Sequence, residues 1–429
     1  MRIDEIALRN FRGFEEFAVR LHPKLTVFVG NNGSGKSAIL DALAIAAGTF
    51  FSGLDGVPSN GIAREDVTCK SFHLGTVIDL QHQYPAVIAV RGEIDGESLT
   101  WSRSLNSPAG RTTTINAKSI ISVAEHYLKR IRQGDTSAIL PVISYYGTGR
   151  LWAQKKEKRA LEQLAQFNRL SGYTDCLAAE SNEKLMLKWF EKMTIQQAQQ
   201  GKISPELNAA RQAIACCFAG ITGADDVDIQ FNLDTHSLDV LYTSATGQHS
   251  RMPMKNLSDG YRNTLGMIAD IAYRMAILNP QLLGDVLQKT PGIILIDEVD
   301  LHLHPRWQQR IIGDLQAVFP QVQFIVSTHA PAVISSVRQD NLRILSGEKQ
   351  SSTVPAEVYG KDANSILTGV MDASPRPAEI QSLFGRFYQA IDSGELEKAA
   401  RTLDEIEYLI GAEDPELVGA RVSLALERI

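Results

Sequence analysis

The chain has 429 residues, of which 44% are hydrophobic and 21% are charged, and its formal net charge is −6. This composition is typical of a soluble globular protein, and the length predicts one large domain with appendages or two domains. The negative charge excludes a uniformly basic nucleic-acid coat, although it is compatible with a local basic patch. No apolar run is long enough to span a membrane, no signal-peptide core is present, and the four cysteines lack C-x-x-C spacing. We therefore expect a cytoplasmic protein with reduced thiols and no membrane partner.

The first chemical signal is the stretch "TVFVGNNGSGKSAILDALA" at residues 26–44, which contains the pattern G-x-x-x-x-G-K-S. Before it, Leu25–Val29 is a short apolar run that predicts a buried parallel strand. After it, an amphipathic helix is predicted from the spacing of Leu40, Leu43, Ala44 and Ala47. A strand, a glycine loop and a helix in this order are typical of a phosphate-binding loop, and the alternative is a glycine turn before an ordinary helix.

This loop is expected to bind ATP together with Mg²⁺. Backbone N–H groups would turn inward around the β-phosphate, and the helix N-terminus adds a favourable dipole. Lys36 would reach the β- and γ-phosphates, and the hydroxyl of Ser37 would bind Mg²⁺. The positions expected to contact the nucleotide are Gly30, Asn31, Asn32, Gly33, Ser34, Gly35, Lys36, Ser37 and Ala38.

The long middle of the chain predicts two hairpins and a helical region. Residues 86–105 predict two strands joined around Asp95–Gly96, and residues 227–244 predict a second hairpin. Residues 155–218 predict a compact helical insertion without sustained heptads, which excludes a long coiled-coil arm. The run KKEKR at residues 155–159 is either a solvated helix face or a contact for nucleic acid.

A second helix with a distinctive start follows at "LSDGYRNTLGMIADIAYRMAIL", residues 257–278. Ser258 and Gly260 lie where a hydroxyl and free N–H groups make an anion site. Taken alone, L-S-D-G is ordinary turn chemistry before a helix. Asn279–Pro280 is expected to end the helix, whose apolar stripe consists of Leu265, Ile268, Ala269 and Ala272.

Two further strands are expected to deliver polar residues to one sheet edge. "GIILIDEVDLHLHP" at residues 292–305 predicts a buried strand that ends at Asp297 and Glu298. Asp297 would hold Mg²⁺ directly or through water, and Glu298 would polarise the attacking water. The apolar strand "QFIVSTHAP" ends at His329, which would bind the γ-phosphate; the alternative is a structural histidine at a strand end.

The order of a P-loop, L-S-x-G, an acid pair and a strand-end histidine resembles the ABC-type ATPase heads of the SMC, RecF and OLD class. The resemblance implies an α/β fold with a mixed sheet around the P-loop, an antiparallel β lobe, a helical insertion and a helical tail. It also implies a head-to-tail dimer in which Ser258 acts on ATP held by the other subunit. In "IALRNFRGFEEF", Arg12 matches a basic residue that approaches the nucleotide in this class. "YYGTGRLW" and "DEVDLHLHP" narrow the resemblance to bacterial ABC-like ATPases with relatives in Septu-type and retron-associated anti-phage systems.

Two positions depart from the pattern of that class. Such heads carry a glutamine after the first lobe, yet Tyr145–Arg150 contain none and Gln154 is the nearest. His304 replaces an aspartate that helps to couple the two sites. With His302 it could suggest a metal site, but two imidazoles alone make a poor one, so we expect a loop or dimer contact instead.

The expected domains are residues 1–150 and 223–350 for the two parts of the head, 151–222 for the insertion and 351–429 for a linker and tail. Residues 375–429 predict three short helices with breaks at Ser393–Gly394 and Gly411, and lack the strands of a fused nuclease.

We therefore expect an ATP-hydrolysing switch, dimeric or larger, that controls a separate effector such as a nuclease in anti-phage defence. The alternatives are a DNA-binding repair ATPase like RecF or SMC, a transporter subunit, which the N-terminus and missing glutamine disfavour, and a small-molecule kinase, which would leave Ser258 and His329 idle.

Overall fold

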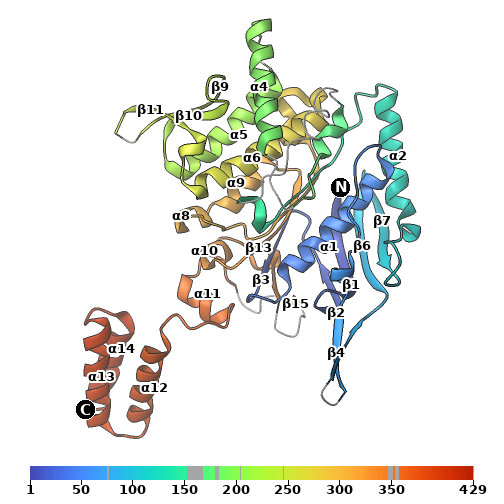
Figure 1. Ribbon diagram of the computed structural model, residues 1–429. Helices are drawn as coiled ribbons and strands as arrows, with labels where there is room; N and C mark the ends of the chain where they lie inside the picture. Colours follow the sequence, from blue (N-terminus) through green and yellow to red (C-terminus); the bar gives the residue numbers. More distant parts are fainter. Residues whose placement is uncertain are drawn as a thin grey trace. The chain divides into compact units, whose positions relative to one another are not determined.

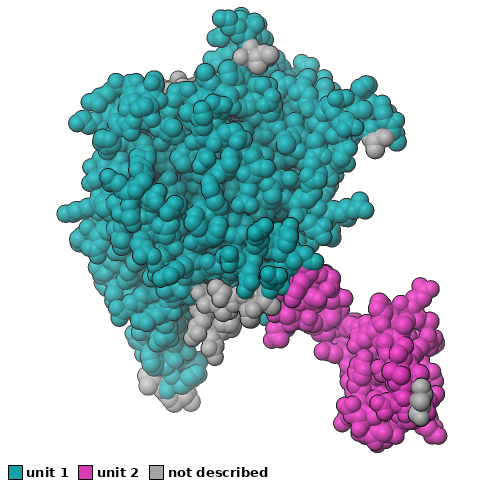
Figure 2. Space-filling model, turned by 180° about the vertical axis from the view of Figure 1, so that it is seen from behind, with its two compact units in different colours: residues 1–360 teal, residues 361–429 magenta. Residues whose placement is uncertain are grey.

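The structure, a computed structural model of the chain, describes residues 1–74, 77–151, 168–178, 183–202, 204–244, 246–345, 351–352 and 357–428. These residues form two compact units, residues 1–360 and 361–429, which Figure 2 shows in teal and magenta. All the motifs with phosphate chemistry lie in the first unit, and the predicted helical tail forms the second. The expected divisions of the head at residues 150 and 222 stay predictions.

The largest sheet of the first unit has six strands, in the order β15 (Ser351–Ser352), β14 (Leu342–Leu345), β3 (Leu25–Val29), β13 (Val322–Thr328), β12 (Gly292–Ile296) and β8 (Val142–Tyr146). All neighbours are parallel except β14 and β15. Every residue of β3 and β12 is buried, as the apolar runs predicted. The carboxyl ends of β3, β12 and β13 therefore place the P-loop, the acid pair and the histidine at one edge.

A four-stranded antiparallel sheet has the order β2 (Phe14–Arg20), β1 (Arg2–Phe11), β6 (Ala86–Ile94) and β7 (Glu97–Leu105). The predicted hairpin is confirmed as β6 and β7, joined at Asp95–Gly96. Gln323 of β13 links the two sheets, because its amide donates to the carbonyl of Ile3 at 2.7 Å and accepts from the N–H of Ile3 at 2.8 Å. The smaller strands β4 (Cys69–Leu74) and β5 (Val77–His82) form a separate hairpin.

Helix α1 (Lys36–Gly48) packs against β8, β12 and β13 of one sheet and β6 of the other (Figure 1). The sequence predicted an amphipathic helix, which is wrong, since only Ser37 is exposed and only Asp41 is half-buried. The helix is almost entirely buried because strands of both sheets pack against it. Helix α2 (Lys118–Arg132) packs against β7.

The region expected to be a helical insertion contains α4 (Glu183–Gln200) and α5 (Pro205–Thr222). The run at residues 155–159 lies outside the described residues. Helix α5 packs against α6 (Asp259–Leu278) and against β9 (Asp225–Asn232), which forms an antiparallel sheet with β10 (Ser237–Thr243) and β11 (His249–Pro253). Strands β9 and β10 confirm the second predicted hairpin. The helices are therefore packed into the first unit.

Helix α6 contains a buried ion pair whose carboxylate also bonds the parallel sheet, and the helix ends before Asn279–Pro280 as predicted. Arg274 Nε lies 2.7 Å from Asp270 Oδ2, and the same oxygen accepts the hydroxyl of Tyr146 from β8 at 2.7 Å. Arg274 also donates to the carbonyl of Gly172 at 3.0 Å. Because an unpaired buried charge costs several kcal/mol, these bonds hold α6 in one position against the end of β8.

The remaining helices of the first unit are short: α7 (Val286–Lys289), α8 (Pro305–Gln308), α9 (Ile311–Val318) and α10 (Pro331–Ile334). Among the described residues, no helix has both the length and the apolar character to cross a membrane. All four cysteines are unpaired, and Cys176 and Cys217 are buried.

The second unit contains α11 (Ala363–Gly369), α12 (Ala378–Asp392), α13 (Leu396–Ile410) and α14 (Pro415–Leu426). The last three are the predicted short helices, and both predicted breaks are confirmed. They enclose a core of their own, formed by Ile380, Leu383, Phe384, Phe387, Ala390, Ala399, Leu403, Ile406, Leu417, Ala420 and Leu424.

Candidate nucleotide-binding site

The loop between β3 and α1 depends on glycine for its shape. Gly33 and Gly35 have φ values of 81° and 99°, in the left-handed region that residues with a Cβ rarely adopt. A Cβ on Gly35 would also lie 2.4 Å from the ring of Phe14. No larger residue fits at Gly35, so the loop can close tightly around a small anion.

Lys36 is buried at the first turn of α1, and its ammonium faces the loop. Its Nζ donates to the carbonyl oxygens of Gly30 at 2.8 Å and Asn31 at 3.1 Å. Burial lowers the pKa of Lys36, and the nearby carboxylates of Asp297 and Glu298 oppose that shift. A positive charge in this place can exchange loop carbonyls for phosphate oxygens without moving out of the site.

A pocket of about 300 Å³ opens beside the loop. Its lining brings together the P-loop, the acid pair and the histidine that the sequence placed far apart. Phe14 and Gly13 were not predicted; their sequence signal was only their place beside Arg12. Three expected loop positions, Gly30, Asn31 and Ser34, are not among the lining residues. The lining consists of Gly13, Phe14, Asn32, Gly33, Gly35, Lys36, Ser37, Ala38, Asp297, Glu298 and His329.

The two acids follow β12 and are held by a serine of the neighbouring strand. Ser327 Oγ donates to Asp297 Oδ1 at 2.5 Å and accepts the backbone N–H of Glu298 at 2.8 Å. Asp297 is buried, whereas Glu298 is half-buried and has a φ of 48°. A non-glycine residue in this region is strained, so the surrounding bonds must hold it. Ser327 thus holds the carboxylate of Asp297 and the backbone of Glu298, a role that sequence reasoning missed.

His329 directly follows the last residue of β13. Burial lowers the pKa of His329, and the positive charge of Lys36 lowers it further, so the ring is neutral at pH 7. The preceding Thr328 donates from Oγ1 to Asp300 Oδ1 at 2.5 Å and accepts the N–H of Ala330 at 3.0 Å. Thr328 therefore ties the histidine segment to the loop after the acid pair.

The donors in the pocket fit Mg²⁺ bound together with phosphate. Ser37 offers a hydroxyl and Asp297 a carboxylate, and both residues line the pocket. No group of three or more His, Cys, Asp or Glu side chains suited to a metal occurs among the described residues. Magnesium is normally held by one or two protein oxygens plus substrate phosphates and water, and this pair meets that need.

Arg12 lies next to the pocket-lining Gly13, but its guanidinium faces two carboxylates. Its Nε lies 2.8 Å from Asp66 Oδ1, and its Nη1 pairs with Asp41 of α1. Burial raises the pKa of Asp41, while Arg12 and a hydrogen bond from Tyr145 act in the opposite direction. Arg12 itself is not among the residues that line the pocket, so its contact with the nucleotide stays a prediction.

The start of α6 is not part of the lining of the pocket in its own chain. Ser258 precedes the first turn and is exposed, and neither Ser258 nor Gly260 lines the pocket. Gly260 is buried, and a Cβ there would lie 2.3 Å from the carbonyl oxygen of His302. The backbone of α6 is therefore packed directly onto the loop that follows Asp297 and Glu298.

The structure shows the surroundings of the two positions that depart from the expected pattern, the end of β8 and His304. Strand β8 ends at Tyr146, and Gln154 lies outside the described residues. Tyr145 of β8 hydrogen-bonds Asp41 of α1. His304 caps helix α8, because its Nδ1 accepts the N–H of Arg306 at 3.3 Å.

Comparison with protein families matches two profiles to this chain. One, described as an AAA domain, matches residues 5–215, which contain the P-loop. The other, described as "AAA domain, putative AbiEii toxin, Type IV TA system", matches residues 213–335, which contain Ser258, the acid pair and His329. The two profiles together span the nucleotide pocket.

Curated relatives include ATPases of bacterial retrons and Septu proteins. The chain is 26% identical over 435 residues to the Retron Ec83 probable ATPase of Escherichia coli, covering 88% of this chain and 78% of that protein. It is 31% identical over 148 residues to the Septu protein PtuA of Bacillus mycoides (strain KBAB4), covering 33% of this chain and 20% of PtuA.

Among solved structures, an SMC head bound to the C-terminal winged-helix domain of ScpA matches with a TM-score of 0.50 and 15% identity. The match covers 83% of this chain and 99% of that one. The predicted fold class is thereby confirmed. The chain contains AAA-family ATPase domains, is homologous to the retron and Septu ATPases, and has the fold of an SMC head.

Proposed function

We propose that this ATPase is a switch that closes as a head-to-tail dimer around two ATP molecules and thereby controls a separate effector. The observation that carries the proposal is the separation of Ser258 from the pocket. Each chain has a P-loop, an acid pair and a histidine in one pocket, while its L-S-x-G serine is exposed elsewhere. A second chain can supply that serine, so two chains complete two sites.

Within each site, different residues bind the phosphates, activate the attacking water and hold Mg²⁺. Lys36 binds the β- and γ-phosphates, and neutral His329 donates a hydrogen bond to the γ-phosphate. Glu298 accepts a proton from the water that attacks the γ-phosphorus, and the phosphate–phosphate bond then breaks to give ADP and inorganic phosphate. Mg²⁺, held by Ser37 and Asp297 when bound, would neutralise phosphate charge. Loss of the γ-phosphate removes what His329 and the partner's serine hold, so the dimer opens.

Dimer closure is tested with a variant that binds ATP without hydrolysing it. Glu298→Gln is incubated with ATP or ADP, and its mass is measured by analytical ultracentrifugation. We expect the mass to double with ATP and not with ADP, and the added Ser258→Arg change to prevent the doubling. A Glu298→Gln protein that stays monomeric with saturating ATP would contradict the dimer switch.

We further propose that the effector, a nuclease of an anti-phage system, docks on the second unit. The names of the retron and Septu relatives support a role in defence. The three tail helices bury a core of their own but leave a set of apolar side chains exposed on α13 and α14. This set, named the tail face, consists of Tyr408, Leu409, Val418, Val422 and Leu426.

The charge of the tail indicates what kind of surface would fit the tail face. Residues 361–429 contain 13 acidic and 7 basic residues, so they account for the whole net charge of −6. A matching effector surface would be apolar at its centre and basic at its rim. The double variant Val422→Glu, Leu426→Glu should lose effector capture and keep ATP binding. Gln381→Glu, at an exposed position of α12, should change neither property. Unchanged capture by the double variant would rule out the tail face.

A further inference from the structure

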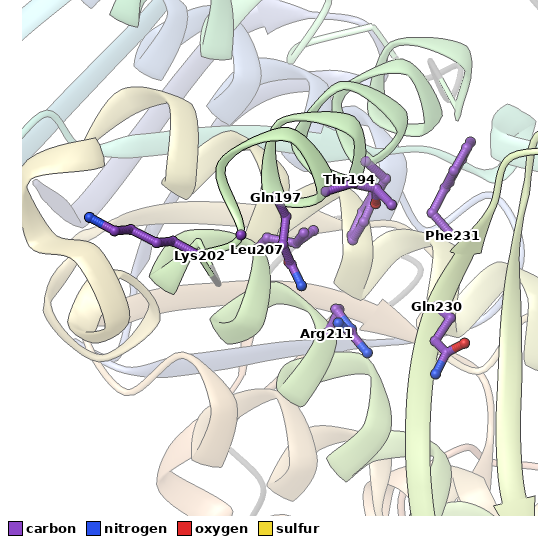
Figure 3. Close-up of a pocket in the computed structure, with 10 residues that line it drawn as sticks. Thr194, Gln197, Lys202, Leu207, Arg211, Gln230 and Phe231 are labelled. Carbon is purple, nitrogen blue, oxygen red and sulfur yellow. The ribbon is translucent and has the colours of Figure 1, made fainter.

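A second pocket, of about 500 Å³, lies between helices α4 and α5 and strand β9, outside the nucleotide site. Figure 3 shows Gln197 and Arg211 coming from the helices and Gln230 from β9 on the other side. The pocket has an apolar floor, because Phe190, Leu207 and Phe231 are buried. Its full lining is Phe190, Thr194, Gln197, Ala198, Gly201, Lys202, Leu207, Arg211, Gln230 and Phe231.

Two buried polar atoms on the pocket-lining side chains have no hydrogen-bond partner among the described residues. They are Oε1 of Gln197, an acceptor, and Nε of Arg211, a donor. The rest of the Arg211 head is engaged, since its Nη2 lies 2.7 and 2.9 Å from the two carboxylate oxygens of Asp228. Buried polar groups are normally paired, so these two atoms indicate a ligand with one acceptor and one donor.

The pocket also borders the backbone edge of a strand. Gln230 and Phe231 both line it, although successive side chains of a strand point to opposite faces of the sheet. A space bordered by both therefore lies at the edge of β9. In the described part of the chain, β9 is the last strand of its sheet and pairs only with β10. An unpaired strand edge presents N–H and C=O groups to an incoming strand.

We propose that this pocket binds an extended peptide segment of a partner protein. The segment runs along the free edge of β9, and an apolar side chain enters among Phe190, Leu207 and Phe231. The peptide backbone supplies both missing partners: a carbonyl accepts from Arg211 Nε, and an N–H donates to Gln197 Oε1. Addition of a strand to a sheet edge, with a pocket for one side chain, is a common mode of peptide recognition.

The charges favour a neutral peptide group over a phosphate-bearing ligand. Asp228 offsets the charge of Arg211, and hydrogen bonds from Arg211 and Gln230 lower the pKa of Asp228 against the effect of burial, so the carboxylate stays ionised. The other cation of the lining, Lys202, is exposed, and Figure 3 shows its side chain extending away from Arg211. The pocket therefore lacks the paired cations that a phosphate group needs.

The test uses a random twelve-residue peptide library displayed on phage and selected on the full-length protein. Enriched peptides are synthesised, and their affinity is measured by isothermal titration calorimetry. We expect Gln197→Leu to weaken binding about tenfold, as for one lost hydrogen bond, and Gln197→Glu, which keeps an acceptor, to restore it. Ala198→Trp, at an exposed helical position, should block the pocket. Gln199→Leu, exposed on the same helix and outside the lining, is the matched control.

All four variants should hydrolyse ATP at the wild-type rate, which separates this proposal from the nucleotide switch. Peptides that bind equally well to wild type, Gln197→Leu and Ala198→Trp would overturn it. A selection that enriches no binding peptide would also overturn it. Binding of inorganic phosphate at this pocket, measured with no peptide present, would show that the ligand class is wrong.

Discussion

Helices α1 and α6 both begin with glycine-containing sequences that suit phosphate binding, but only α1 faces the pocket of its own chain. Lys36 and Ser37 of α1 line that pocket, whereas Ser258 before α6 is exposed and does not. Both helices are nevertheless firmly packed: α1 between two sheets and α6 through its buried Asp270–Arg274 pair. On the proposed function, an exposed serine at the start of a firmly packed helix is suited to a partner's nucleotide rather than that of its own chain.

The largest effect is expected on ATP binding, from a substitution at the start of α1. Lys36→Ala should weaken ATP binding by more than about 100-fold, because the pocket loses its buried positive charge. Lys24→Ala is the matched control, since Lys24 is exposed and its Nζ donates to the carbonyl oxygen of Pro320. Fluorescent-nucleotide titration measures both. Retained binding in Lys36→Ala would break the assignment of α1 as the nucleotide helix.

A substitution in the acid pair should slow ATP hydrolysis without weakening ATP binding. Glu298→Gln should bind ATP as wild type does and lose hydrolysis by about 100-fold or more, because an amide cannot accept the proton of the attacking water. The measurement is steady-state phosphate release beside nucleotide binding. Hydrolysis at the wild-type rate would show that Glu298 is not the base.

Ser327 should have a smaller effect on the same step. Ser327→Ala removes the hydroxyl that holds both Asp297 and the N–H of Glu298, and kcat should fall about tenfold, as when a group that orients a metal ligand is lost. The KM for ATP should change less than kcat, since Lys36 is untouched. An unchanged kcat would mean that Ser327 does not position the two acids for hydrolysis.

The smallest effect is expected on stability, from a substitution that tests how α6 packs against the loop after the acid pair. Gly260→Ala forces a Cβ to within 2.3 Å of the carbonyl oxygen of His302 and should lower the free energy of unfolding by about 1–3 kcal/mol. Gly266→Ala on the same helix meets nothing within 4 Å and should be neutral or stabilising. Thermal unfolding of the two variants compares them directly. Equal destabilisation would show that the contact with His302 is not specific.

Sequence predicted the parts of the site that depend on local pattern. The P-loop, the acid pair and His329 each follow a short apolar run, and the run places them at one sheet edge. Contacts between distant segments were invisible: the ring of Phe14 against Gly35, and Ser327 against the acids. The burial of α1 was missed for the same reason, since its apolar spacing does not reveal that a second sheet covers the helix.

The most direct test of the account asks whether Ser258 of one chain completes the site of another. Lys36→Ala and Ser258→Arg proteins carry different tags, each is inactive alone, and doubly tagged heterodimers are purified after mixing. Such a heterodimer contains one intact composite site and one doubly broken site. The account predicts that it traps ATP and regains part of the hydrolysis rate. Purified heterodimers that neither trap nor hydrolyse ATP would contradict the shared site, since a serine acting within its own chain gives no recovery on mixing.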